Sequence, residues 1–235
     1  MYSQTARYYD LIYRQFKDYP NECRLVDEFV RTHLPSAKRL LDVACGSGTH
    51  AEILSREYGY QVDGLDLEPD FVEIAGGKAI NGSIYHADMT DFDLGTTYDV
   101  ILCLFSSIAY AKTEKHIIRA LTCFRKHLAG GGMILVEPWF APDEFFPGRV
   151  HLDTAEDENT KICRMAYSDA AGTVSRIHFE YLLGTGEGLA HFSEIHELGL
   201  LTKAQMLDCF HRAGLDVSYQ TGGFCGRGLY IARML

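Results

Sequence analysis

A pair of glycines after a short apolar run is the part of the sequence that most directly suggests chemistry. The run Leu40–Ala44 leads into Gly46 and Gly48, and a helix-like segment follows. Because glycine has no Cβ, the backbone can turn sharply there and approach a ligand closely. The N–H groups at the start of the following helix favour an anion. This pattern predicts a nucleotide-binding loop at the carboxyl end of a strand.

Two acidic residues beside this loop narrow the choice of ligand. Asp66 stands eighteen residues after Gly48, at the end of the next apolar run, where a carboxylate can accept hydrogen bonds from ribose hydroxyls. The segment 46–51 also satisfies the dinucleotide pattern GxGxxG/A. Asp42 argues against a dinucleotide, because a carboxylate repels pyrophosphate but attracts the ammonium and sulfonium of S-adenosylmethionine. A purely structural strand-to-helix turn also remains possible.

Further polar and aromatic side chains follow later predicted strands, at the sheet edge where ligands bind in open α/β folds. Tyr110 could hydrogen-bond an attacking amine, and Glu137 and Trp139 follow the next strand. Trp139 could form a platform for a sugar or a base. Arg227 has a glycine on either side, so a phosphate could come close to its bidentate guanidinium. Core packing for Trp139 and a solvated turn for Arg227 are equally open at this point.

The N-terminal segment is rich in tyrosine, at Tyr2, Tyr8, Tyr9, Tyr13 and Tyr19. Its simplest interpretation is a helix that packs on the sheet. The functional interpretation is a lid over the cofactor, because aromatic faces near a sulfonium gain roughly 0.5 to 2 kcal/mol each by cation–π attraction. Such a lid would also exclude water.

Histidine and cysteine spacing does not predict a metal site. His191 and His196 lie on one predicted strand at an odd spacing, which puts them on opposite faces. An ordinary surface or core histidine is the default interpretation, and of the two we favour His191 as an acceptor contact. The seven cysteines are scattered without a CxxC pair, which predicts reduced thiols in a cytoplasmic protein.

Apolar runs alternate with helix-like segments over the first two thirds of the chain. The expected strands are 38–44, 61–67, 83–87, 98–104 and 133–137, and the expected helices are 49–58, 68–78 and 113–128, the last ended by Gly130–Gly132. Such alternation predicts parallel strands joined by right-handed crossovers. The fold class is therefore α/β, with a doubly wound, Rossmann-like sheet.

The pattern changes after Pro138. Strand-like segments at 161–167, 173–183 and 190–200, separated by glycine turns, predict an antiparallel β insertion over about 145–201. A helix at 203–213 and strands at 215–219 and 229–234 are then expected to return to the parallel layer. Without a linker or repeat, we expect a single domain, 1–235, that contains this insertion.

Composition excludes several classes of protein. With 47% hydrophobic and 23% charged residues, the chain has enough apolar side chains to fold and no apolar run long enough to span a membrane. The net charge of -10 makes a nucleic-acid partner unlikely, because such proteins need a basic face. The N-terminal residues do not look like a secretory signal, so a cytoplasmic location is expected.

The pattern Asp42-x-x-x-Gly46-x-Gly48 with Asp66 resembles the class I S-adenosylmethionine-dependent methyltransferases. A narrower resemblance spans nearly the whole chain and is to the nucleotide-linked amino-sugar N,N-dimethyltransferases of the desosamine and mycaminose type. It is carried by the segments Tyr9-Asp10-Leu11, Lys17-Asp18-Tyr19, Phe105-Ser106-Ser107-Ile108, Glu137-Pro138-Trp139-Phe140, His191–His196 and Gly226-Arg227-Gly228-Leu229. The resemblance implies N-methylation of a dTDP-linked amino-deoxysugar, S-adenosylhomocysteine as product, and a possible homodimer through the insertion.

The resemblance also implies site residues. Cofactor contacts are expected at Tyr19, Asp42, Ala44, Gly46, Gly48, Asp66, Leu67, Asp88, Met89 and Leu104, with Asp88 and Met89 flanking the adenine. Acceptor contacts are expected at Tyr2, Ser106, Glu137, Trp139, His191 and Arg227, the last on a diphosphate. Tyr9 and Tyr110 are the expected catalytic residues, and no metal is expected.

Several functions stay open from the sequence alone. A methyltransferase could act on a different small acceptor, such as a non-nucleotide amine or a hydroxyl. The chain could also be a non-catalytic S-adenosylmethionine-binding protein. An NAD-dependent dehydrogenase is the third possibility, and Asp42 argues against it.

Overall fold

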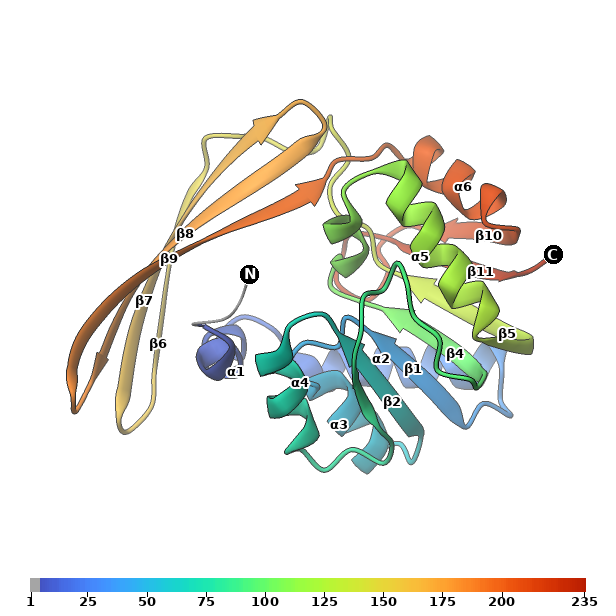
Figure 1. Ribbon diagram of the computed structural model, residues 1–235, viewed down its shortest axis with the longest axis horizontal. Helices are drawn as coiled ribbons and strands as arrows, with labels where there is room; N and C mark the ends of the chain where they lie inside the picture. Colours follow the sequence, from blue (N-terminus) through green and yellow to red (C-terminus); the bar gives the residue numbers. More distant parts are fainter. Residues whose placement is uncertain (1–4) are drawn as a thin grey trace.

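Two β-sheets of unequal size organise the molecule (Figure 1), of which the computed structural model describes residues 5–235. Tyr2 lies outside the described residues. The larger sheet contains β1 (Arg39–Val43), β2 (Gln61–Asp66), β3 (Ile84–His86), β4 (Tyr98–Cys103), β5 (Leu128–Val136), β10 (Leu215–Gln220) and β11 (Leu229–Met234). The smaller sheet contains β6 (Val150–Glu156), β7 (Thr160–Ala171), β8 (Val174–Thr185) and β9 (Gly188–Gly199).

Helices cover both faces of the larger sheet. They are α1 (Tyr9–Tyr13), α2 (Tyr19–His33), α3 (Thr49–Arg56), α4 (Pro69–Gly76), α5 (Glu114–Lys126) and α6 (Lys203–Arg212), with short 3₁₀ turns η1 (Ala6–Tyr8) and η2 (Ser107–Ala111). Among residues 5–235, no helix is long and apolar enough to cross a membrane.

Successive side chains of the central strands belong to opposite core layers, because strand side chains alternate between faces. On β1, Leu40 packs with the buried residues of α2 and α3, whereas Leu41 packs with those of α5 and α6. On β4, Val100 and Ile101 divide in the same way. Two cores around strands buried on both faces confirm the predicted α/β doubly wound architecture.

The strand order is β10-β11-β5-β4-β1-β2-β3, and the pairs β1/β2, β1/β4, β2/β3 and β4/β5 are parallel. The expectation that the last strands would return to the parallel layer is wrong in one respect, because β11 runs antiparallel to β5 and to β10. The segment 221–228 between β10 and β11 is too short for the crossover that parallel neighbours require.

Two boundaries also differ from the sequence expectation. α5 ends at Lys126, and Gly130–Gly132 lie inside β5 instead of ending the helix. Gly132 packs closely against the β4 backbone, since an added Cβ would lie 2.7 Å from the carbonyl oxygen of Asp99. β6 was not anticipated, and it pairs antiparallel with β7 along its whole length.

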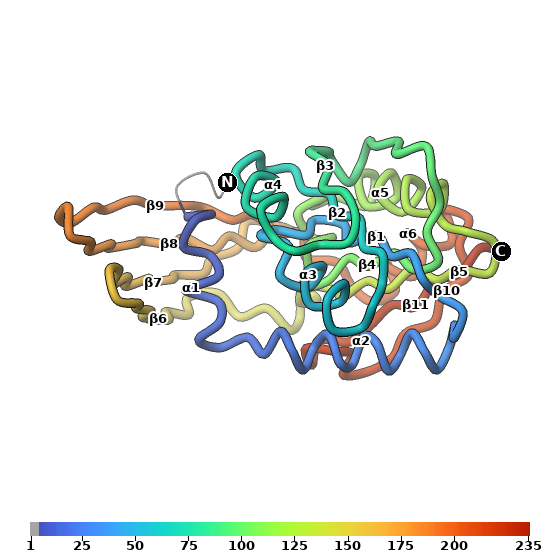
Figure 2. Tube along the Cα trace, turned by 90° about the horizontal axis from the view of Figure 1, so that it is seen from below, coloured from blue at the N-terminus to red at the C-terminus, as the bar shows by residue number. Residues whose placement is uncertain are grey.

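The smaller sheet, β6-β7-β8-β9, projects from the α/β body as an arm (Figures 1 and 2). α1 lies between the arm and the body in both views. Its apolar side chains Ile12 and Tyr13 pack with the inner face of the arm, on Ile162, Phe179 and Tyr181. The N-terminal segment therefore fills the angle between the two sheets.

Candidate functional site

The glycine loop lies at the carboxyl end of β1 and leads directly into α3. Gly48 has φ +76°, and a Cβ there would lie 2.8 Å from the Cβ of Ala75 on α4. Gly46 has φ +55°, and a Cβ there would meet open space. Ala44 also has a positive φ, of 56°, which is unusual for a residue with a Cβ. Gly48 thus lets two elements pack closely, whereas Gly46 keeps the backbone accessible beside the loop.

Asp42 is buried beneath this loop with an unsatisfied oxygen. Its side chain is 2% exposed, and Oδ2 has no hydrogen-bond partner among the described residues. Burial raises the pKa of the Asp42 carboxyl to about 6. A buried carboxylate without a donor is costly, so the site suits a ligand that brings a positively charged donor. The ammonium of S-adenosylmethionine is such a group.

Asp66, at the end of β2, holds the loop in place. Its carboxylate accepts hydrogen bonds from the backbone N–H of Gly46 at 2.8 Å and of Glu68 at 2.9 Å. Burial raises the pKa of Asp66, and the two backbone hydrogen bonds act in the opposite direction. Each carboxylate oxygen keeps a second acceptor position, so this role is compatible with a ribose contact.

The residues expected around an adenine lie at the same sheet edge. Leu67 follows β2 and is 58% exposed. Asp88 is exposed after β3 and accepts a hydrogen bond from the Thr90 N–H, which closes a local turn. Met89 is partly buried against the core. The structure places these three side chains without assigning their role.

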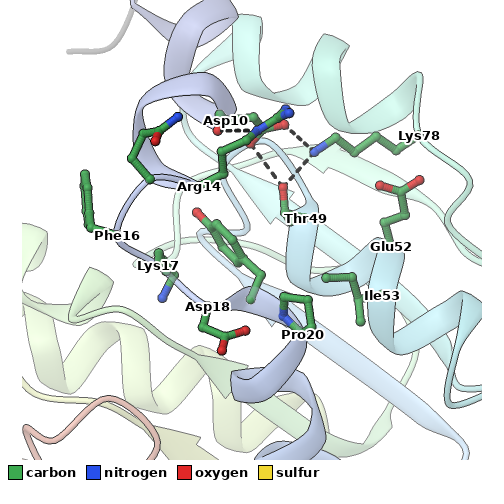
Figure 3. Close-up of a pocket in the computed structure, with 12 residues that line it drawn as sticks. Asp10, Arg14, Phe16, Lys17, Asp18, Pro20, Thr49, Glu52, Ile53 and Lys78 are labelled. Atoms are coloured by element: carbon green, nitrogen blue, oxygen red, sulfur yellow. Dashed lines mark hydrogen bonds and ion pairs between the residues drawn. The ribbon is translucent and has the colours of Figure 1, made fainter. Parts of the chain in front are cut away.

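The N-terminal segment covers the loop from above. The Asp10 carboxylate on α1 accepts a hydrogen bond from Ser47. It also accepts hydrogen bonds from Thr49 at 3.1 Å and from Lys78 at 2.7 Å, which Figure 3 shows. Asp10, Thr49 and Lys78 also line an open cavity of about 740 Å³ between this segment and α3. The structure shows that Asp10 anchors α1 to the glycine loop. Asp10 belongs to the Tyr9-Asp10-Leu11 segment, but the sequence predicted no role for it.

A second cavity, of about 40 Å³, lies beneath the segment and is lined by Tyr9, Tyr19, Asp42, Gly46 and Leu104, among others. Cavities that hold drug-sized ligands measure roughly 300 to 1,000 Å³. A ligand that contacts Asp42 and the loop together therefore has to displace the segment above them. The segment lies where a lid over the loop would have to lie, and the lid itself stays a prediction.

Burial raises the pKa of the Tyr9 phenol well above its usual value, and the neighbouring phenols of Tyr13, Tyr19 and Tyr110 add to this effect. The Tyr9 phenol of α1 and the Tyr110 phenol of η2 therefore interact electrostatically. Tyr9 stacks on Tyr13 with ring centroids 4.1 Å apart. The structure therefore brings both predicted catalytic tyrosines to one place.

Lys17 is a buried cation that sequence reasoning left without a role. Its Nζ lies 4.0 Å from the Phe105 ring centroid and forms an ion pair with Glu22, whose other neighbour is His50 Nε2 at 2.9 Å. Burial alone would raise the pKa of Glu22, but the His50 and Lys17 interactions outweigh it and lower that pKa. A lysine within an aromatic-rich segment was the signal available in the sequence.

Arg227, before β11, points into an aromatic frame at the carboxyl edge. Its guanidinium carbon lies 4.9 Å from the Trp139 ring centroid, 5.2 Å from that of Phe140 and 5.7 Å from that of Phe105. It donates a hydrogen bond to Ser106 Oγ at 3.0 Å. Guanidinium has five donors, so this contact leaves several for a ligand.

The turn after β4 is strained and is supported by Glu137. Phe105 and Ser106 have φ values of 52° and 64°, which residues with a Cβ rarely adopt. The Phe105 N–H donates to Glu137 Oε2 at 2.7 Å, and Ser106 Oγ donates to the Pro138 carbonyl at 2.6 Å. Strained turns of this kind cluster at functional sites. Glu137 is 1% exposed; its Oε2 holds this turn, and its Oε1 has no hydrogen-bond partner among the described residues.

The base of the arm closes the remaining side of the site. Trp139 Nε1 donates a hydrogen bond to Ser175 Oγ on β8 at 2.9 Å. The Tyr110 hydroxyl lies 2.8 Å from Nδ1 of His196 on β9. The insertion therefore contributes its own side chains to the group around Tyr110 and Trp139.

His191 is not part of this group, which corrects the expectation for it. It lies five residues farther along β9, about 16 Å at the usual rise per strand residue, on the opposite face. Its imidazole is exposed and pairs with Glu180 at 2.8 Å. The odd spacing of the two histidines was interpreted correctly, but the inward-facing residue is His196.

A family model described as "Methyltransferase domain" matches residues 40–132 of the chain. The dTDP-3-amino-3,6-dideoxy-alpha-D-glucopyranose N,N-dimethyltransferase of Streptomyces fradiae is 38% identical over 229 residues, covering 97% of this chain and 89% of the relative.

Two solved structures are similar over the same span. DesVI of Streptomyces venezuelae is 35% identical with a TM-score of 0.91 and covers 98% of each chain. CalS10, an amino pentose methyltransferase from Micromonospora echinaspora solved with bound S-adenosylmethionine, is 32% identical with a TM-score of 0.84 and covers 95% of each. The chain belongs to this family of S-adenosylmethionine-dependent methyltransferases.

Proposed function

We propose that the protein transfers methyl groups from S-adenosylmethionine to the amino group of a dTDP-linked amino-deoxysugar and releases S-adenosylhomocysteine. The observation that carries the acceptor class is Arg227, a partly buried cation in an aromatic frame at the same sheet edge as the glycine loop. A diphosphate suits the donors of such a guanidinium. The acceptor named for the Streptomyces fradiae relative, a dTDP-3-amino sugar, supports the same class.

The cofactor half of the site is built on β1 and β2. We assign the cofactor ammonium to Asp42, the ribose hydroxyls to Asp66, and the methionine end to Tyr19. The loop Ala44, Gly46 and Gly48, with Leu67, Asp88, Met89 and Leu104, would line the remaining surface. These assignments are supported by the unsatisfied Asp42 oxygen and by the open space beside Gly46.

The acceptor half is built on β4, β5 and the arm. We assign the diphosphate to Arg227 with Ser106, a ring platform to Trp139, and the vicinity of the amine to Tyr9 and Tyr110. Glu137 acts by holding the turn that carries Ser106. Tyr2 precedes the described residues, and its expected contact stays a prediction.

The chemistry is an in-line displacement. When bound, S-adenosylmethionine would supply an electrophilic methyl group on its sulfonium; the nitrogen–carbon bond to a neutral amine would form as the carbon–sulfur bond breaks, with S-adenosylhomocysteine as the leaving group. The protein's residues contribute chiefly orientation, which can supply roughly 7 to 11 kcal/mol. Tyr9, Trp139 and the covering segment exclude water, and desolvation lowers the pKa of an ammonium and so favours the attacking neutral amine.

Arg227→Ala tests the acceptor assignment. We expect KM for a dTDP-amino-sugar to rise by roughly 10- to 100-fold, because hydrogen bonds to charged groups contribute about 1.5 to 3 kcal/mol. Affinity for S-adenosylhomocysteine, measured by calorimetry, should stay within about twofold of wild type. Arg119→Ala is the matched control, since Arg119 is half-exposed on α5. An unchanged KM in Arg227→Ala would remove the diphosphate from the proposal.

We also propose a homodimer through the arm. The outer face of the arm carries the exposed apolar side chains Val150, Leu152, Met165, Tyr167 and Ile195. Cross-strand register places Val150 beside Tyr167, and Leu152 beside Met165. An apolar face of this kind favours burial against a second copy.

All seven cysteines are free thiols, which supports a reducing, cytoplasmic compartment.

A further inference from the structure

A line of polar side chains runs from the inner face of the arm to Tyr110. The Tyr110 hydroxyl lies 2.8 Å from His196 Nδ1, and His196 Nε2 lies 3.4 Å from Glu194 Oε2. The other oxygen of Glu194 accepts a hydrogen bond from Thr5 Oγ1 at 2.6 Å. His196 is 1% exposed and Glu194 9%. Burial of two titratable side chains is unfavourable, so their presence here requires a structural or a chemical explanation.

The contacts favour one tautomer of the His196 ring. An ionised carboxylate only accepts hydrogen bonds, so the nitrogen that faces Glu194 is Nε2–H. In the neutral ring Nδ1 is then an acceptor, and the Tyr110 hydroxyl donates to it. A phenol that donates its proton can still accept one through a lone pair on the same oxygen. This arrangement is suited to moving a proton from Tyr110 toward the arm.

The line ends among the groups assigned to the acceptor. The Tyr110 phenol interacts electrostatically with that of Tyr9. His196 pairs with Ile177 in the β8/β9 register, one inward-facing position from Ser175, which accepts the Trp139 hydrogen bond. His196 therefore lies on the arm side of Tyr110 and not in the interior of the arm. Its position is between the Trp139–Ser175 hydrogen bond and the N-terminal segment.

Few other charged groups face His196. On its own strand the neighbour is Glu194, and from η2 it is Tyr110, with Tyr9 of α1 beyond. From β8 the Phe179 ring meets the imidazole edge-on at 5.1 Å, and the Arg164 guanidinium of β7 lies 4.8 Å from that ring. Among residues 5–235, Glu194 is the only carboxylate in ion-pair distance of His196.

We propose that His196, oriented by Glu194, is a positioning residue that holds Tyr110 and takes its proton while Tyr110 accepts one from the acceptor amine. This inference rests on the proposed function. The amine N–H bond breaks as a Tyr110 O–H bond forms, and the original Tyr110 proton passes to His196 Nδ1. The positive charge moves from the methylated ammonium to an imidazolium beside Glu194. No oxidant or metal takes part.

The test compares kcat in wild type, Tyr110→Phe, His196→Asn and the double variant, with a dTDP-3-amino sugar as acceptor. Asn keeps a hydrogen-bond acceptor near Tyr110 but cannot take a proton at neutral pH. We expect kcat to fall on the order of 100-fold in each single variant, as for a lost general acid–base group. The double variant should be no worse than either single one, because both remove the same relay.

The division of the effect between kcat and KM separates this role from a structural one. His196→Asn should lower kcat while KM for the dTDP-amino sugar, S-adenosylhomocysteine affinity and melting temperature stay close to wild type, because the relay acts only in the proton transfer. His191→Asn, at an exposed carboxylate-paired histidine on the same strand, is the control and should keep wild-type kcat and KM. More than half of wild-type kcat in His196→Asn would overturn the proposal.

A second measurement does not depend on turnover. Nitrogen-15 NMR of histidine-labelled protein with S-adenosylhomocysteine, with the His196 signal assigned by its loss in His196→Asn, should show Nε2–H and bare Nδ1 at about pH 7.5. An Nδ1–H tautomer or a doubly protonated ring would overturn the inference. Wild-type protein that methylates no nucleotide-linked amine would contradict the proposed function instead, and the tautomer would still decide the geometry.

Discussion

At the scale of single residues, the site combines Asp66, whose carboxylate is satisfied within the protein, with Asp42 and Glu137, which each keep one oxygen without a hydrogen-bond partner among the described residues. Asp66 and Glu137 both accept backbone hydrogen bonds and hold turns. Asp42 has an unsatisfied oxygen, although it is nearly as deeply buried as a core leucine. Such groups are rare in natural proteins and each needs an explanation, of which a ligand that completes the group is one. Asp42 is therefore where cofactor binding and stability of the unliganded protein are in conflict.

Asp42→Asn should move these two properties in opposite directions. S-adenosylhomocysteine affinity should fall by roughly 10- to 100-fold, the range for a hydrogen bond to a charged group. For wild type the affinity should also decrease as pH falls through about 6, where Asp42 gains its proton. The variant should lack that decrease. Calorimetric titration between about pH 5 and 8 measures both effects.

The unliganded variant should be more stable than wild type above about pH 6. The pKa of Asp42 is raised on folding, so its contribution is favourable at low pH and is lost as pH rises through about 6. Removing the charge should therefore raise the free energy of unfolding at about pH 8 by about 2 to 3 kcal/mol. The gain should disappear near pH 4, and equal melting temperatures at pH 8 would contradict the account of this residue.

At the scale of elements, the arm has two different faces. Its inner face packs on α1 and contributes Ser175 and His196 to the site. Its outer face carries apolar side chains in cross-strand rows and covers nothing in the described part of one chain. α1 is held on both sides. It packs on the arm, and its own Asp10 carboxylate accepts hydrogen bonds from Thr49, beside the glycine loop, and from Lys78. The arm thus links a candidate subunit interface to the cover of the cofactor site.

Charge on the outer face should separate the proposed dimer. Light scattering after gel filtration should give wild type twice the 26.4 kDa mass of one chain. Leu152→Glu with Met165→Glu should give the mass of one chain, because two carboxylates in a buried apolar contact are strongly unfavourable. Leu235→Glu, an exposed position at the end of the body, is the control. Wild-type protein that runs as one chain at micromolar concentration would contradict the proposal.

At the scale of the whole molecule, local patterns in the sequence predicted the parallel sheet. Each apolar run and the acidic residue that follows it are close together in the sequence, so both can be identified without knowing the fold. The doubly wound fold then brings Asp42, Asp66, Tyr110 and Trp139 to one edge without further information. The direction of β11 was missed because strand periodicity carries no direction. The contacts of Asp10, Lys17 and Glu22 were missed because their partners lie on other elements or become neighbours only in the packed structure.

The position of His196, a residue of the proposed acceptor site, could be predicted from the sequence only in part. Glu194 and His196 are two residues apart on a strand and so share one face, which was visible in the pattern. Which face would turn inward depends on how α1 fills the angle between the sheets, and that is a property of the whole molecule. We propose that arm and body form a single domain for the same reason, because α1 packs on both.

The most direct test of the proposed function is methyl transfer itself. The protein would be incubated with methyl-deuterated S-adenosylmethionine and a panel of dTDP-linked 3-amino and 4-amino deoxysugars, and the products weighed by mass spectrometry. We predict the gain of one or two labelled methyl groups on a nucleotide-linked amine, and none on the matching dTDP-sugar that carries a hydroxyl instead. No labelled product from any nucleotide-linked amine, in a preparation that binds S-adenosylhomocysteine tightly, would contradict the proposed function.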